Sequence, residues 1–484
     1  MPDINWAADA VFILDLLIRI GFSLRIISRR LPVGVSLAWL SVVLIFPYAG
    51  VLIYLLIGES RLGKQRGRRA AALRESYRSW AKSLRESDPA STADLTGAAG
   101  GMARLAEVAL DSPPLAGNDV QLLRNAGEAF PALIRDIDAA RQTCHLEFYI
   151  WDVGGLADEV VEALLRAAAR GVTCRVLVDA VGSRTFLGSD RARRLRAGGV
   201  TLREALPVTL RRLLFVRADL RLHRKIVVID GIVGFTGSLN LADPALFKKN
   251  AGVGQWVDAL ARVQGPAVAA LGAIFLQDWE LETGEALPVP AREGLPARPA
   301  GGRAVVQVLP SGPGERVGAI ERILLTAVYA ASRELVLTTP YFVPDETLLS
   351  ALLSAPGRGV DVTLIVPAKV DSRMTHYASR AHQTDLLAAG VRVALYRDGL
   401  LHTKSLAVDG QFSLFGSLNL DPRSLRLDFE VMLAVYDADF TAALRRLQQS
   451  YVERSDWLDL ATCQSRSAVE RFTEDAARLV GPLL

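Results

Sequence analysis

The stretch LHRKIVVID (222–230) has a counterpart, LHTKSLAVD (401–409), about 180 residues further along the chain. Each places a lysine two residues after a histidine and an aspartate five residues after the lysine, although the chain holds only five histidines. The β-branched run that ends at Asp-Gly predicts a strand followed by a turn. A repeat built on such a rare residue indicates two copies of one structural unit.

Alternation along these strands predicts which side chains share a face. Residues two apart lie on the same side, so each histidine lies beside its lysine, and each aspartate, with opposite parity, lies behind the strand. The sequence GSLN follows both aspartates, with its serine and asparagine again two apart. The candidate catalytic residues are therefore those of the two motifs, His223, Lys225, Asp230, His402, Lys404 and Asp409, and the candidate supporting residues are Ser238, Asn240, Ser417 and Asn419.

The duplication extends beyond these motifs. HLEFYIWDVGGLADEVVEALLRAAARGVTCRVLVDA, from His145, and ELVLTTPYFVPDETLLSALLSAPGRGVDVTLIVPA, from Glu334, both read as strand, turn, amphipathic helix and a strand entered through RGV. Apolar residues three and four apart support the helices, and the continuous apolar runs support buried strands. Strands alternating with helices predict an α/β fold. We expect two similar α/β sandwich domains side by side, with the active site at their interface.

The paired motifs suit chemistry at a phosphodiester. Two lysines, with hydroxyl and amide donors, can hold the phosphate oxygens and stabilise the charge that develops on them. One neutral imidazole can attack phosphorus, and a second, protonated imidazole can give its proton to the leaving oxygen. Imidazole titrates near neutral pH, so both forms are accessible. Because each half supplies one histidine, a single copy of the motif is half a site.

The N-terminus carries a long apolar stretch. VGVSLAWLSVVLIFPYAGVLIYLLI (33–57) contains no charged residue, and its length predicts a helix that crosses a membrane, with a kink at Pro47. The earlier segment, Trp6 to Ile27, holds four charges and fits either a second span or a helix in the membrane interface. More Lys and Arg follow Ile57 than precede Val33, which places the rest of the chain in the cytoplasm.

Composition sets the remaining limits. A chain of 484 residues predicts more than one domain, and its net charge of +4 suits nucleic acid, an anionic membrane or an anionic substrate equally well. Three widely spaced cysteines form no metal-binding pattern. We expect a membrane anchor (1–60), a juxtamembrane connector (61–115), a first catalytic domain (116–286), a Pro- and Gly-rich linker (287–302) and a second catalytic domain (303–484).

The sequence resembles the phospholipase D superfamily, whose signature is HxKxxxxD followed by GSxN. Within it, nearly the whole chain resembles bacterial cardiolipin synthases, in segments such as HRKIVVIDGIVGFTG, QVLPSGP, TTPYFVPDETLLSALLSAPGRGVDV and GSLNLDPRSLRLDFEV. One departure is Asp428, which stands where an asparagine commonly precedes the final Phe-Glu. The resemblance implies phosphatidyl transfer between two phosphatidylglycerols through a phosphatidyl-histidine, without metal or cofactor.

The resemblance also implies roles for individual residues. His223 would be the nucleophile and His402 the general acid and then base. A carboxylate downstream of each histidine would hold its other nitrogen: Glu430 for the second motif, and Asp258 as the counterpart in the first half. The implied partners are phosphatidylglycerol, cardiolipin and an anionic membrane, and the implied location is the bacterial inner membrane with the catalytic domains in the cytoplasm.

Other functions fit parts of the same evidence. A phospholipase D that hydrolyses phospholipids, or that transfers phosphatidyl groups to another alcohol, would use the same motifs. A nuclease of the superfamily is disfavoured because the chain has an apolar N-terminus and no array of aromatic residues for stacking bases. A catalytically inactive membrane scaffold is disfavoured by the two intact motifs. The sequence does not indicate an oligomeric state.

Overall fold

The computed structural model describes residues 6–29, 31, 33–59, 64–87, 95–208, 217, 219–288 and 299–480. The chain forms two compact units, one of residues 1–67 with 208–220 and one of residues 68–207 with 221–484. Most of the predicted linker (287–302) lies outside the described residues.

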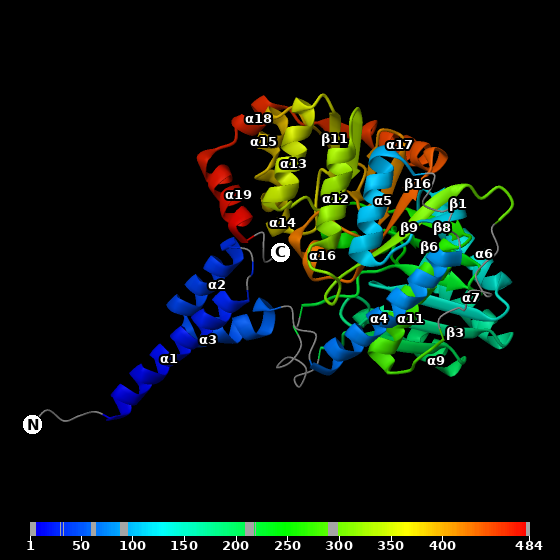
Figure 1. The fold of residues 1–484 in the computed structure, drawn as a ribbon, viewed down its shortest axis with the longest axis horizontal. Helices are drawn as coiled ribbons and strands as arrows, with labels where there is room; N and C mark the ends of the chain where they lie inside the picture. Colours follow the sequence, from blue (N-terminus) through cyan, green and yellow to red (C-terminus); the bar gives the residue numbers. More distant parts are fainter. Residues whose placement is uncertain are drawn as a thin grey trace, which may run out of the picture. The chain divides into compact units, whose positions relative to one another are not determined.

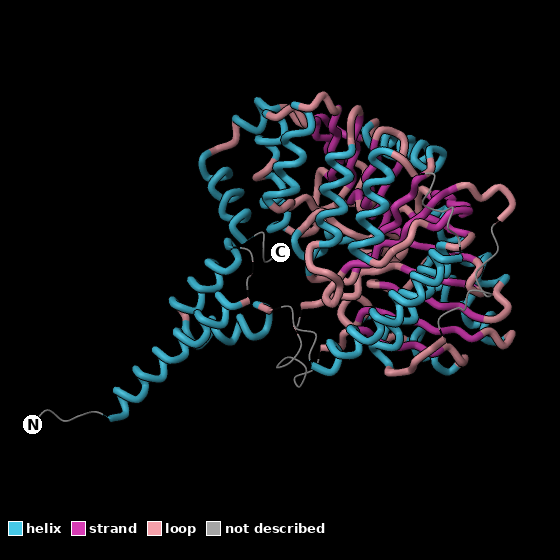
Figure 2. Tube along the Cα trace, in the orientation of Figure 1, coloured by secondary structure: helices cyan, strands magenta, loops and turns pink. Residues whose placement is uncertain are grey.

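A single mixed sheet of fifteen strands runs through the large unit (Figures 1 and 2). Its order is β17-β12-β11-β10-β14-β15-β16-β9-β1-β8-β6-β5-β2-β3-β4. The first half of the chain contributes β1 (Leu115–Leu123), β2 (Thr143–Phe148), β3 (Thr173–Asp179), β4 (Thr201–Ala205), β5 (Ile226–Ile229), β6 (Val233–Gly237) and β8 (Leu260–Gln264). The second contributes β9 (Ala304–Ser311), β10 (Glu334–Thr338), β11 (Asp361–Pro367), β12 (Arg392–Tyr396), β14 (Lys404–Val408), β15 (Phe412–Gly416), β16 (Glu430–Tyr436) and β17 (Ser455–Trp457).

The strand order demonstrates the duplication predicted from sequence. Read outward from the central β9–β1 pair, β9, β16, β15, β14, β10, β11 and β12 match β1, β8, β6, β5, β2, β3 and β4 one for one. Antiparallel pairing of β1 with β9 joins the halves, with Leu115 opposite Val306 and Asn118 opposite Ala304. The two halves therefore lie side by side in one continuous sheet inside one compact unit, and their division into two domains stays a prediction.

Each half nevertheless has its own buried core. Helices α6 (Ala126–Ala139), α7 (Leu156–Ala169) and α9 (Asp190–Ala197) supply the first core, and α5 (Gly97–Leu110), α12 (Ala319–Ala330), α13 (Glu346–Gly357) and α15 (Gln383–Ala388) supply the second. The other α-helices that the structure describes in this unit are most of α4 (Lys64–Ser87), α8 (Arg184–Leu187), α11 (Ala267–Thr283), α14 (Arg373–Arg380), α16 (Pro422–Arg426), α17 (Ala438–Val452), α18 (Leu460–Gln464) and α19 (Ala468–Val480).

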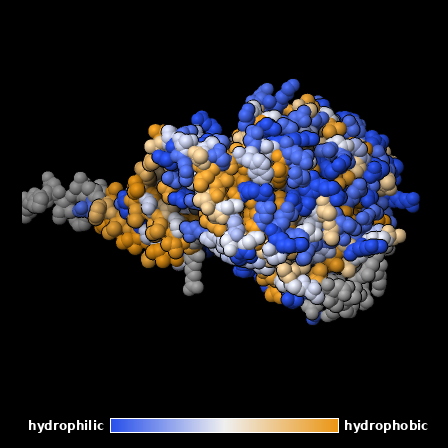
Figure 3. Space-filling model, turned by 90° about the horizontal axis from the view of Figure 1, so that it is seen from above, coloured by the Kyte–Doolittle hydropathy of each residue, from blue (hydrophilic) through white to orange (hydrophobic). Residues whose placement is uncertain are grey.

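The small unit contains the N-terminal helices, which are rich in apolar residues. They are α1 (Trp6–Ser28), α2 (Val33–Ile45), α3 (Pro47–Ile53) and the π-helix η1 (Tyr54–Gly58). Ile26, Trp39, Val43 and Tyr54 form its buried centre. Many other apolar side chains are exposed, and they give this part of the surface its orange colour in Figure 3.

The predicted membrane-crossing helix over 33–57 does not form as one helix. The segment is interrupted at Phe46, whose φ of −122° and ψ of 71° lie outside the helical region. The following Pro47 disfavours a helical residue before it and lacks the N–H that a continuous helix needs. Helix α1 is longer but carries Asp9, Asp15, Arg19 and Arg25. Across the described residues, no helix combines the length and apolar character needed to span a membrane.

Candidate active site

Each histidine segment is bonded to the opposite half of the chain. The His223 backbone N–H donates to the Phe429 carbonyl at 2.9 Å, and a β-bridge joins Leu222 to Phe429. The His402 N–H donates to the Val257 carbonyl at 2.8 Å. There β13 (Leu400–Leu401) pairs in parallel with β7 (Trp256–Val257). These reciprocal bonds bring both motifs to the junction of the two halves.

The carboxylates that hold the histidines also come from the opposite halves. His223 Nδ1 lies 2.8 Å from Glu430 Oε1, and His402 Nδ1 lies 2.7 Å from Asp258 Oδ1. Both carboxylates are buried. The sequence identifies the right acids but pairs each with the histidine of its own half, and the structure reverses that pairing. With Nδ1 occupied, Nε2 is the nitrogen of each ring that can meet a substrate.

The lysines are held against their own motifs. Lys225 Nζ donates to the His223 carbonyl at 2.6 Å, and Lys404 Nζ donates to the His402 carbonyl at 2.7 Å. Burial lowers the pKa of Lys225 to about 8 and the pKa of Lys404 well below its usual value. A bound phosphate would favour the charged ammonium groups and oppose this effect.

The lysines of both motifs contribute to the pKa shift of each histidine. Burial lowers the pKa of His223 well below its usual value, and Lys225 and Lys404 act in the same direction. Burial lowers the pKa of His402 to about 3, and both lysines again contribute. Each imidazole therefore senses the ammonium groups of both halves, as expected for one shared site, and both are neutral at pH 7.

The two serines and Asn240 make hydrogen bonds at the site, and each of the two asparagines also has one buried side-chain atom without a partner. Ser417 Oγ donates to Glu430 Oε2, whereas Ser238 Oγ accepts the Ala259 N–H at 3.1 Å. Asn240 Oδ1 accepts the Ile150 N–H at 3.1 Å. Among the described residues, the Asn240 Nδ2 and Asn419 Oδ1 atoms are buried without hydrogen-bond partners. Unsatisfied buried polar groups are costly, so these amides are candidates to contact a ligand.

The two motif aspartates lie behind their strands, as alternation predicts. Asp230 accepts backbone N–H groups of Arg141, Gln142 and Thr143 at 2.7–2.8 Å. Asp409 likewise accepts those of residues 332–334 at 2.8–2.9 Å. Both aspartates have a φ of 52° at the first turn position and precede glycines with positive φ, a conformation typical of tight hairpin turns. Their contacts are structural, which corrects their grouping with the catalytic residues.

Two aromatic rings at the site were not singled out from the sequence. Tyr149 packs against His223 with ring centroids 4.8 Å apart, and Trp256 packs against His402 at 4.4 Å. Trp256 stands two residues before Asp258, so strand parity could have identified it. Tyr149 follows β2, and no local pattern relates it to His223.

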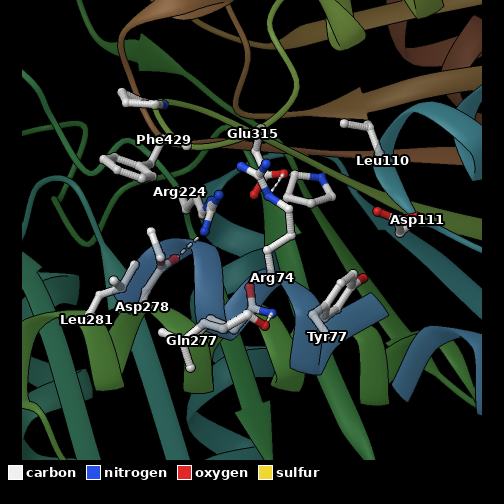
Figure 4. Close-up of a pocket in the computed structure, with 15 residues that line it drawn as sticks. Arg74, Tyr77, Leu110, Asp111, Arg224, Gln277, Asp278, Leu281, Glu315 and Phe429 are labelled. Atoms are coloured by element: carbon white, nitrogen blue, oxygen red, sulfur yellow. Dashed lines mark hydrogen bonds and ion pairs between the residues drawn. The ribbon is translucent and has the colours of Figure 1, made fainter. Parts of the chain in front are cut away.

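Arg224, between His223 and Lys225, crosses from the first half to the second. Its Nε donates to the Glu430 carbonyl at 3.0 Å, its Nη2 donates to the Ser311 carbonyl at 3.2 Å, and its Nη1 pairs with Asp278. Figure 4 shows this ion pair among the residues that line a small pocket. The volume of the pocket is about 30 Å³. Such a pocket holds one or two water molecules rather than a lipid headgroup. Arg224 therefore belongs to the support behind the site.

A duplicated α/β sheet that brings two His-x-Lys motifs to one junction defines a protein of the phospholipase D superfamily. A sequence model described as "Cardiolipin synthase, PLD-like domain" matches residues 133–279 and 324–451. The chain therefore belongs to the cardiolipin synthase family with phospholipase D-like domains.

Full-length relatives agree with this assignment, and a solved structure shares the fold. Cardiolipin synthase A of Pectobacterium atrosepticum is 43% identical over 466 residues, and that of Yersinia pseudotuberculosis is 44% identical over 466 residues. Both alignments cover 96% of this chain and 96% of the relative. Phosphatidylserine synthase of Haemophilus influenzae shares the fold, with a TM-score of 0.59 at 16% identity over 79% of this chain and 100% of that chain.

Proposed function

We propose that this protein transfers a phosphatidyl group from one phosphatidylglycerol to a second, making cardiolipin and releasing glycerol. The observation that carries the proposal is the reciprocal pairing of each histidine with a buried carboxylate of the opposite half. Such a carboxylate fixes the imidazole tautomer and supports the positive charge that the ring carries during transfer. The full-length similarity to cardiolipin synthases supports this choice among phosphatidyl transfers.

In the first step, His223 Nε2 attacks the phosphorus of the donor lipid. A P–N bond forms, the P–O bond to glycerol breaks, and His402 Nε2 gives its proton to the departing glycerol oxygen. The low pKa of His223 keeps its ring neutral and nucleophilic. His402 must take up a proton when the anionic substrate arrives, and the phosphate charge together with Asp258 favours this.

In the second step, the primary hydroxyl of another phosphatidylglycerol gives its proton to His402 and attacks phosphorus. The P–N bond breaks, the new P–O bond completes cardiolipin, and His223 returns to its neutral form. The two phosphodiesters are equivalent in type, so the transfer requires neither a nucleotide nor an added cofactor. The two lysines and the Nδ2 group of Asn240 would donate to the phosphate oxygens in both steps.

The proposal extends to the setting of the reaction. The substrates are lipids, and the apolar small unit supplies a surface that would associate with an anionic membrane. We assign the protein to the bacterial inner membrane, with residues 1–60 as the anchor, 61–115 as the connector, and the catalytic halves (116–286 and 303–484) in the cytoplasm. Phosphatidylglycerol and cardiolipin are its partners, and nucleic acid is not.

A single assay tests the function. The purified full-length protein receives phosphatidylglycerol in mixed micelles, with chelator and without nucleotide. Cardiolipin and glycerol in equal amounts are expected, and the His223→Ala variant should form neither. Phosphatidic acid as the main product would instead identify a hydrolase.

A further inference from the structure

A charged cluster lies on the His402 side of the site. We call Lys248, Trp256, Tyr341 and Asp371 the His402 rim. Lys248 Nζ pairs with Asp371 Oδ2 at 2.8 Å, and the Tyr341 hydroxyl donates to Asp371 Oδ1 at 2.7 Å. The first half supplies Lys248 and Trp256, and the second half supplies Tyr341 and Asp371. The rim is thus a second polar connection between the halves at this site.

The rim fixes the ammonium group of Lys248 close to His402. Lys248 Nζ lies 5.2 Å from the centre of the Trp256 ring, and that ring lies 4.4 Å from the His402 ring. These spacings place the ammonium within about 10 Å of the imidazole. The Lys248 side chain is 46% exposed, whereas the Asp371 side chain is 10% exposed. A solvent-accessible cation is therefore anchored on a largely buried carboxylate.

The chemistry of the second step calls for a cation at about this distance. The attacking hydroxyl lies at His402, because His402 takes its proton. The acceptor lipid carries its own phosphodiester, roughly 7 Å from the reacting phosphorus when the three-carbon bridge is extended. Glycerol, the group that leaves in the first step, has no phosphate. A phosphate subsite on the His402 side therefore serves only the acceptor.

We propose that Lys248 binds the phosphodiester of the acceptor lipid, an inference that rests on the proposed function. An ammonium has three N–H donors, so the contact with Asp371 leaves two for phosphate oxygens. Asp371 holds the ammonium in place, and Tyr341 holds Asp371. The His402 rim then determines specificity: it favours an acceptor that is itself a phospholipid over water or a neutral alcohol.

Two reactions of the same enzyme separate this role from general catalysis. Cardiolipin synthesis uses an acceptor with a phosphate, whereas exchange of radiolabelled glycerol into phosphatidylglycerol uses an acceptor without one. Both require His223, His402 and the lysines of the motifs. Both are measured on full-length protein in the same mixed micelles, with phosphatidylglycerol varied as a mole fraction.

The variants are Lys248→Met and Lys248→Arg, with Lys249→Met as the matched control. Lys249 is the exposed neighbour in the chain. Losing a charge-assisted contact should lower kcat/KM for cardiolipin synthesis about tenfold or more, chiefly through KM. Glycerol exchange should fall no more than about twofold. The arginine variant should keep most of the synthesis, and Lys249→Met should match the unmodified protein.

The outcomes are decisive in both directions. Equal losses of synthesis and exchange in Lys248→Met would overturn the proposal, as would unchanged synthesis. Inorganic phosphate that inhibits synthesis more than exchange, and only when Lys248 is present, would show that the site takes free phosphate as well as the lipid phosphodiester. If the unmodified protein exchanged glycerol but made no cardiolipin, the proposed function itself would fail, independently of Lys248.

Discussion

The two histidines of the site have different carboxylate partners, and this difference bears on their roles. His402 contacts Asp258, whose pKa lies below its usual value despite burial, because His402 and Lys404 favour the carboxylate. His223 contacts Glu430, whose pKa burial raises to about 8. An ionised carboxylate supports an imidazolium, and a protonated one does not. Asp258 therefore favours a proton on His402, whereas Glu430 becomes the carboxylate partner of a cationic ring once the phosphatidyl group on His223 makes that ring positive and lowers the Glu430 pKa.

A substrate with a good leaving group should separate these roles. Phosphatidyl-p-nitrophenol needs little protonation at its leaving oxygen, so His402→Ala should still release a burst of nitrophenol and retain phosphatidyl-His223. General acid catalysis is worth roughly 10²–10⁴-fold, so with phosphatidylglycerol the same variant should lose about that much. His223→Ala should give no burst. Stopped-flow absorbance and mass spectrometry of the labelled peptide make the measurement, and a burst from His223→Ala would reverse the assignment.

The buried lysines predict how activity depends on pH. Lys225 holds phosphate oxygens only as an ammonium, and its pKa in the free protein is about 8. Proton uptake by His402 already lowers kcat/KM as pH rises, and loss of the Lys225 ammonium should make kcat/KM fall more steeply above pH 8, because kcat/KM reports the free enzyme. Arginine stays protonated, so Lys225→Arg should move this high-pH limb, the fall of kcat/KM above pH 8, to higher pH. A limb that stayed near pH 8 in Lys225→Arg would assign the titration to Glu430 instead.

At the scale of single elements, the hairpin turns explain why each motif ends in aspartate. The Asp230 carboxylate joins the β5–β6 turn to the start of β2 through three backbone N–H groups. Asp409 does the same for the β14–β15 turn and β10. Strand β5, which begins directly after Lys225, and strand β14, which carries Lys404, are thereby fixed against the strands beside them. The aspartates support the site from behind.

Replacing Asp230 should therefore cost stability before it costs chemistry. Asp230→Ala leaves three N–H groups without their acceptor, and the free energy of unfolding should fall by about 2–4 kcal/mol. Asp230→Asn keeps one acceptor oxygen and should lose less. Thermal unfolding followed by circular dichroism measures the effect, with kcat of the folded fraction as the comparison. A hundredfold loss of kcat with unchanged unfolding would instead return Asp230 to the catalytic group.

The individual elements also show which features of the fold and site can be predicted from the sequence. The strands, their hairpins and the position of both aspartates follow from alternation and turn chemistry, which are local. The exchange of Glu430 and Asp258 between halves is a tertiary property, because spacing along the chain does not tell which strand end meets which histidine. Tyr149 was missed for the same reason. For residues 33–57, the apolar composition predicts one membrane-crossing helix, whereas the structure ends a helix just before Pro47.

At the scale of the whole molecule, neither half is a complete unit. The first half lacks the carboxylate that bonds to His223, and the second half lacks the carboxylate that bonds to His402. The pairing of β1 with β9 joins the strands of the two halves into one sheet. Arg224 adds buried contacts from the first half to Ser311 and Glu430 in the second. Because both halves belong to one chain, each meets the other at a high effective concentration, which favours these reciprocal contacts.

Cutting the chain between the halves should therefore leave the enzyme active. A protease site inserted within 287–302 can be cleaved in the purified full-length protein, with the uncut insertion variant as control. The fragments should co-elute in non-denaturing size exclusion and keep most of the cardiolipin synthesis, because the shared sheet and the reciprocal histidine contacts remain. Fragments separated in denaturant should be inactive alone and regain activity when refolded together. Activity from either fragment alone would contradict a site that needs one histidine and one carboxylate from each half.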